Sequence, residues 1–105
     1  MITSVLKKIR KDIDLSFRGL ISNHSSQQKI YSTGEICGIF KKKLEEAGYR
    51  VKIVRGYFKN EKNMHIWLKI FNGDGWIFID PLQKDFKINK HYRVAAEYDY
   101  LEEVF

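Results

Sequence analysis

A hairpin signal in the second half of the chain constrains the fold most. The dipeptide Asn72-Gly73 stands between two runs rich in β-forming residues, 64–71 and 75–80. Asn-Gly is the strongest two-residue hairpin signal, because both central residues of a type I′ turn adopt positive φ. Two antiparallel strands are therefore expected here. Pro81 should end the second strand, since proline has no N–H to donate to a ladder.

This turn determines which residues face each other across the hairpin. With the two-residue turn, Lys69 faces Trp76 and His65 faces Asp80. Directly opposed side chains on one face lie about 4.5–5.5 Å apart at Cβ, so an imidazole can hydrogen-bond a carboxylate across the strands. The sequence thus predicts a paired histidine and aspartate.

Two other registers are open. A four-residue loop over 72–75 makes His65 and Asp80 diagonal neighbours, which can still be within reach of each other. A turn at Asp74-Gly75 sets His65 against Lys84, beyond the proline, which does not suit a ladder. Two of the three registers therefore keep the histidine near the carboxylate.

Helical spacing of apolar residues predicts two helices before the hairpin. Ser32 and Glu35 fit a capping box at the start of the second helix, and Gly48 is its stop signal. The two helices are expected over 3–20 and 33–47, with a polar loop between them over 22–32.

The rest of the chain completes a small mixed fold. The segment 50–58 alternates β-forming residues and predicts a third strand, whereas 82–105 fits either a helix or a strand. The chain has 105 residues, 44% of them hydrophobic, which is enough for one core. We expect one α+β domain over 1–105, with N-terminal helices packed on an antiparallel sheet of three or more strands.

Composition argues against several classes of function. A single cysteine excludes an internal disulfide and a four-cysteine zinc site, and the three histidines are scattered, so neither metal nor cofactor is expected. The net charge of +6 suits an anionic partner, but the lysines are dispersed, which argues against nucleic acid. There is no apolar run of about 20 residues and no secretory signal, so we expect a cytoplasmic protein without a membrane span.

The lone cysteine gives the histidine and aspartate a possible chemical role. Cys37 lies near the start of the second predicted helix. A thiolate is the active nucleophile, and a neighbouring imidazole lowers the pKa of the thiol while a carboxylate orients the ring. If His65 is close, we expect the thiol of Cys37 to be unusually acidic.

Several blocks of the sequence, within about residues 31 to 82, resemble the transglutaminase-like superfamily, which shares a papain-like core. The blocks are Gly34-Glu35-Ile36-Cys37, 48–57, His65-Ile66-Trp67, Gly75-Trp76 and Asp80-Pro81. The resemblance implies that Cys37 is the nucleophile, His65 the base and Asp80 the orienting acid. Family enzymes are usually larger, so the resemblance says less about substrate than about chemistry.

The chemistry that follows is acyl transfer at an amide or peptide bond of a protein or peptide substrate. Hydrolysis through a thioester is favoured. Amine transfer, a non-catalytic interaction domain and a basic nucleic-acid-binding module are the alternatives. The Cys37 backbone N–H is the first expected oxyanion donor, with Gln27, Gln28 and Tyr31 as side-chain candidates. Trp67, on the same strand face as His65, is expected to border the site.

Overall fold

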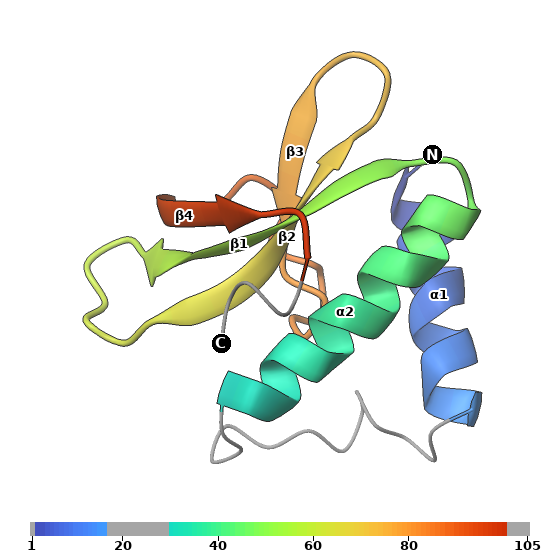
Figure 1. Ribbon diagram of the computed structural model, residues 1–105, viewed down its shortest axis with the longest axis horizontal. Helices are drawn as coiled ribbons and strands as arrows, with labels where there is room; N and C mark the ends of the chain where they lie inside the picture. The colour runs from blue at the N-terminus through green and yellow to red at the C-terminus, as the bar shows by residue number, and fades with distance from the viewer. Residues whose placement is uncertain (1, 17–29, 101–105) are drawn as a thin grey trace.

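The computed structural model describes residues 2–16 and 30–100, excluding the side chains of 30–32, and shows two helices packed on a four-stranded antiparallel sheet (Figure 1). The α+β prediction is confirmed. The sheet order is β3-β2-β1-β4. The elements are α1 (Ile2–Ser16), α2 (Ile30–Glu46), β1 (Arg50–Phe58), β2 (His65–Phe71), β3 (Trp76–Ile79) and β4 (Tyr92–Tyr98).

The register between β2 and β3 corrects the favoured hairpin. Lys69 pairs with Phe78 and not with Trp76, so the two-residue turn is wrong and the four-residue loop over 72–75 is present. The side chain of Asn72 explains the difference. Its Oδ1 accepts hydrogen bonds from the N–H groups of Asp74 and Gly75, at 3.0 and 3.1 Å. Asn72 therefore closes the loop from its first position and does not occupy a central turn position.

The two ends of α2 compare differently with their predictions. The helix begins at Ile30, so Ser32 lies inside it and the predicted capping box does not mark its start. The stop at Gly48 is confirmed, with φ of 97°. The N–H of Tyr49 donates to the carbonyl of Leu44 at 3.0 Å and that of Gly48 to Glu45 at 3.0 Å, which is a Schellman motif.

Apolar side chains fill both faces of the sheet, but they differ in kind. The face toward the helices, called here the helix face, packs mainly aliphatic residues of both helices and the strands: Leu6, Ile9, Ile13, Ile36, Leu44, Ile53, Ile66, Leu68, Ile70 and Ile79, with Cys37 and Phe40. The opposite face, called here the outer face, holds Val54, Phe58 and Trp67, with Phe78 and Tyr92 packed against them. Strand alternation sorts the residues this way, because successive side chains point to opposite faces.

The open question about residues 82–105 is resolved within the described part. Residues 92–98 form β4, an edge strand that pairs with β1 and carries an irregularity opposite Arg55 and Gly56. Before it, the segment 80–91 turns back under the helices, where the buried Phe86 packs edge-on against Phe40 with ring centroids 6.3 Å apart. Residues 17–29 and 101–105 lie outside the described range, and so do the predicted C-terminal end of the first helix near 20 and residues 22–29 of the predicted loop. The prediction of a loop is wrong at 30–32, which belong to α2.

Candidate functional site

Cys37 is fully buried on the helix face of the sheet. It is the eighth residue of α2, and its side chain has no solvent exposure. The thiol donates a hydrogen bond to the carbonyl oxygen of Ile66 on β2, at 3.7 Å from Sγ. Burial, and secondarily the negative charge of Asp80, raise the pKa of the thiol well above its ordinary value of 9.0. The expected acidic thiol is therefore wrong for this structure, because desolvation disfavours the thiolate.

His65 is the first residue of β2, and its side chain lies on the outer face of the sheet. Its ring packs against Phe58, with centroids 4.3 Å apart. Its Nε2 lies 2.8 Å from Oε2 of Glu61, in the turn between β1 and β2. The side chain of His65 is 34% exposed, so it is accessible to solvent while the thiol is not. Glu61, and not Asp80, is the carboxylate that holds this imidazole.

Asp80 stands directly after β3 and is 5% exposed. Its Oδ1 accepts the N–H of Leu82 at 3.0 Å, and its own N–H donates to the carbonyl of Phe86 at 2.9 Å. Burial raises the pKa of its carboxyl group, while the Leu82 N–H and the charge of His65 act in the opposite direction. Asp80 therefore closes the 80–86 turn and also interacts electrostatically with His65.

The three predicted residues are each bonded to a different partner: the Cys37 thiol to Ile66, the His65 imidazole to Glu61 and the Asp80 carboxylate to Leu82. The register sets Leu68 opposite Ile79, so one further step places Asp80 opposite Trp67 and diagonal to His65. The negative charge of Asp80 acts on the thiol of Cys37, and the charge of His65 acts on Asp80. The strand end thus brings the carboxylate within electrostatic range of both partners, which themselves lie on opposite faces of the sheet.

Two further residues belong to this region and were not anticipated from the sequence. Glu61 lies in the β1–β2 turn, where no pattern signals an ion pair. Tyr92 begins β4 and packs against Phe58 and Trp67; its pKa is raised, first by burial and then by Asp80, with Cys37 also contributing. Tyr92 could not have been placed, because its segment was left open between helix and strand.

The predicted position of Trp67 can be compared with the structure, whereas the oxyanion role of Gln28 and Tyr31 cannot. Trp67 shares the outer face with His65, as predicted, since both rings contact Phe58. Its ring is fully buried, and its Nε1 has no hydrogen-bond partner. Gln28 and the side chain of Tyr31 lie outside the described residues, so their oxyanion role stays a prediction.

Other parts of the described chain hold neither a metal cluster nor a membrane span. Within residues 2–16 and 30–100, no group of three His, Cys, Asp or Glu side chains is placed to hold a metal ion. Neither described helix is long and apolar enough to cross a bilayer.

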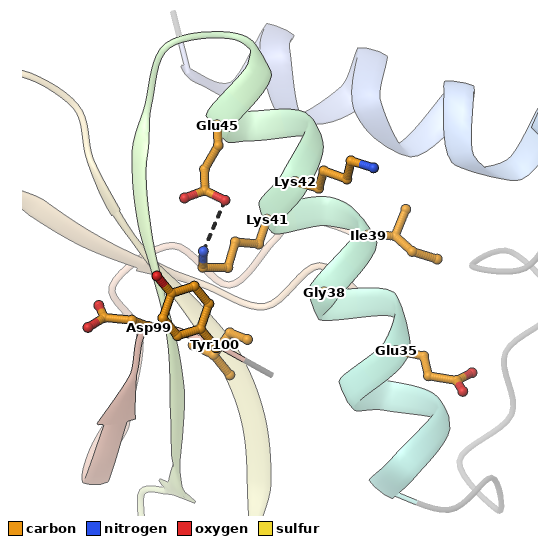
Figure 2. A pocket seen from close by; sticks show the side chains of 9 residues that line it. Glu35, Gly38, Ile39, Lys41, Lys42, Glu45, Asp99 and Tyr100 are labelled. Carbon is orange, nitrogen blue, oxygen red and sulfur yellow. Dashed lines mark hydrogen bonds and ion pairs between the residues drawn. The ribbon is translucent and has the colours of Figure 1, made fainter. Parts of the chain in front are cut away.

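A hollow of about 550 Å³ lies between α2 and the end of β4, away from the three candidate residues. Figure 2 shows Lys41 and Glu45 of α2 joined by an ion pair of 3.0 Å, beside Asp99 and Tyr100. None of Cys37, His65 or Asp80 lines this hollow. It therefore adds nothing to the chemistry of the candidate site.

Comparison with known proteins gives no relative for this chain. No family model, no curated protein and no solved structure matches it.

Proposed function

We propose that this protein is a cysteine-dependent acyl-transfer enzyme with a papain-like, transglutaminase-like core, acting by hydrolysis on an amide or peptide bond. The observation that carries the proposal is geometric: the β2–β3 register makes Asp80 a diagonal neighbour of His65, and the Cys37 thiol bonds the carbonyl of Ile66, the residue after His65. The blocks of sequence that resemble the transglutaminase-like superfamily supply the same three residues in the same order.

The proposed reaction has two steps, formation of a thioester on Cys37 and its hydrolysis. His65 takes the proton of the Cys37 thiol, and the sulfur attacks the carbonyl carbon to form a tetrahedral intermediate. The C–N bond then breaks, His65 delivers the proton to the leaving amine, and a thioester is left. In the second half, His65 takes a proton from water, the oxygen displaces sulfur from the carbonyl, and the proton returns to the thiolate.

The described arrangement is a closed form of such a site. The thiol is protonated and bonded to the carbonyl of Ile66, and the imidazole is bonded to Glu61. Reaction therefore requires that Cys37 becomes accessible, that His65 leaves Glu61, and that the thiol and the imidazole, which lie on opposite faces of the sheet in this form, are brought together by a rearrangement of α2 against β2. Asp80 is positioned to stabilise the imidazolium that forms, since an opposite charge nearby favours the charged ring.

Trapping the thioester tests the proposal. The protein is incubated with peptide anilides, and intact mass spectrometry follows an acyl adduct that Cys37→Ala cannot form. Release as the free acid supports hydrolysis, whereas transfer to an added primary amine supports transglutaminase-type chemistry. With a broad panel of peptides and no adduct from the parent protein, the enzyme proposal fails.

A non-catalytic interaction domain is the second candidate, and the sealed thiol favours it. Free cysteine often behaves as a small buried apolar residue, and Cys37 packs among aliphatic side chains of the helix face. In that case Cys37→Ala changes stability alone, and no variant of His65 changes any reaction of the thiol.

A further inference from the structure

A cleft of about 410 Å³ opens beside His65, between the β1–β2 turn and the segment that precedes β4. Its floor is the ring of Phe58, the same ring that packs against the imidazole of His65. The lining residues are Phe58, Lys59, Asn60, Glu61, Lys87 and His91. The cleft is thus in contact with the candidate catalytic base through a shared aromatic side chain.

The residues that line this cleft carry a net positive charge, with two lysines against one glutamate. Among the described residues, neither Lys59 nor Lys87 forms an ion pair with a carboxylate. The one acidic lining residue, Glu61, is already bonded to His65 at 2.8 Å. Lys87 Nζ lies 3.6 Å from the centre of the Phe58 ring, so its ammonium group is held over the floor. The cleft is therefore lined by two lysines and one carboxylate, and the ammonium group of Lys87 lies over its aromatic wall.

The two walls of the cleft, the β1–β2 turn and the segment before β4, contain non-glycine residues with positive φ and are joined by a backbone hydrogen bond. Lys59, Lys87 and His91 all have positive φ, at 45°, 45° and 66°. The N–H of Lys59 donates to the carbonyl of His91 at 2.7 Å and joins the walls directly. Non-glycine residues in this region of φ persist only where the surrounding structure imposes them, and they concentrate at functional sites. The cleft is therefore a fixed feature of the fold and not an incidental gap between two loops.

The cleft also contains a lysine whose charge acts on Asp80, the residue at the other end of the candidate site. Lys87 is within electrostatic range of Asp80, whose charge acts on Cys37. A substrate that placed an anionic group between Lys59 and Lys87 would lie across Phe58 from His65.

We infer that this cleft is a recognition subsite for a carboxylate carried by an acidic peptide substrate. The inference rests on the proposed acyl-transfer function for its biological meaning. Its physical content is a binding preference that does not depend on catalysis. An ammonium–carboxylate hydrogen bond is charge-assisted and is stronger than a neutral one, so glutamate should be preferred to glutamine at the same position.

Binding of two matched peptides tests the inference. Acetyl-Gly-Glu-Gly-amide and acetyl-Gly-Gln-Gly-amide are titrated into the protein while NMR follows the backbone amides of Lys59 and Lys87. The glutamate peptide should bind about tenfold more tightly, and this preference should shrink as salt is added. In the double variant Lys59→Gln/Lys87→Gln, the preference should disappear. Lys90→Gln, an exposed lysine of the same segment outside the cleft, should retain it.

The result that would overturn the inference is equal binding of both peptides by the parent protein, or a preference that the double variant keeps. Melting curves of the variants show whether each remains folded, and the parent comparison stands without any variant. Because no bond is made or broken, the preference is measurable even if thioester trapping fails. Conversely, thioester formation without a glutamate preference removes the subsite and leaves the proposed reaction intact.

Discussion

The two faces of the sheet differ in what covers them and in what chemistry they carry. The helix face is a sealed, mainly aliphatic layer that contains Cys37. The outer face is a smaller aromatic cluster around Trp67, and His65 at its margin is accessible to solvent. Strand alternation puts the imidazole of His65 on the outer face, away from the thiol of Cys37, which α2 holds against the helix face. Asp80 can act on both because it stands where the β3 ladder has ended.

The largest expected effect comes from weakening the helix face. Phe40→Ala removes a fully buried ring that contacts Phe86, and should lower the free energy of unfolding by about 3–5 kcal/mol. Phe78→Ala, a partly buried residue of the outer face, should cost less. Urea titrations of the two variants measure the difference. Equal losses would contradict the view that the helix face dominates stability.

A close contact on the outer face gives the next effect. A Cβ at Gly56 would lie 2.6 Å from Cη2 of Trp67 and would also overlap the carbonyl of Arg93. Gly56→Ala should therefore destabilise the protein by about 1–3 kcal/mol through overpacking. Gly75→Ala is the matched control, because nothing lies within 4 Å of its Cβ position. Thermal melts that ranked the two variants alike would show that the outer face is loosely packed.

The buried thiol should make stability decline in alkali. Burial, with a smaller contribution from Asp80, raises the pKa of Cys37, so above pH 9.0 the unfolded thiol ionises while the folded one stays protonated. The unfolded state then binds fewer protons, and stability falls with a limiting slope of about 1.4 kcal/mol per pH unit from this group. The difference between the denaturation midpoints of the parent and Cys37→Ala should therefore shrink between pH 8 and 10.5, because only the parent loses stability through this group. Parallel curves would mean that the thiol is not sealed.

Asp80→Asn should keep the fold and should show what the carboxylate at the end of β3 contributes to stability. Burial raises the pKa of Asp80, so the folded state holds its proton above the ordinary value of 3.8 and stability falls as the pH rises through that window. Asparagine is neutral and can still accept the Leu82 N–H, so this fall should be absent. The melting point at pH 7 should equal or exceed that of the parent. An unfolded variant would show that the carboxylate itself supports the 80–86 turn.

In a serine triad, the same change of aspartate to asparagine costs about 10⁴ in turnover because the histidine takes the wrong tautomer. Loss of the Asp80 charge alone would favour the Cys37 thiolate, because that charge raises the pKa of the thiol, so a slower reaction in Asp80→Asn supports a role of Asp80 through His65. We expect that loss to be smaller than in a serine triad, since a thiol needs less help from its base. Alkylation at neutral pH measures it. A variant that reacted as fast as the parent would remove Asp80 from the site.

Much of the fold could be predicted because its signals are local. The strand over 50–58 matches its observed bounds, and Gly48 ends α2 as expected, since periodicity and a glycine cap act within a few residues. The hairpin register could not be predicted with the same security. It depends on whether Asn72 occupies a central turn position or accepts hydrogen bonds from the first position, and the same dipeptide suits both.

The candidate site was harder to predict than the strands that carry it. Setting His65 directly opposite Asp80 required the two-residue turn, whereas the observed register makes them diagonal neighbours and His65 bonds Glu61. The wall of the cleft beside it was not predictable at all. Non-glycine residues such as Phe86 and Lys87 adopt positive φ because tertiary contacts impose it, and no local pattern signals this.

The dependence of Cys37 alkylation on His65 tests the central claim most directly. Iodoacetamide labelling of the parent, His65→Ala and Lys62→Ala is followed at pH 7 by mass spectrometry, with Lys62 serving as an exposed control in the same turn. Burial makes all rates low, so the ratio between variants is the informative quantity. A general base is worth about 10²–10⁴ in rate. We predict that His65→Ala reacts at least about 100-fold more slowly than Lys62→Ala, and equal rates for the two variants would contradict the role of His65 as the base.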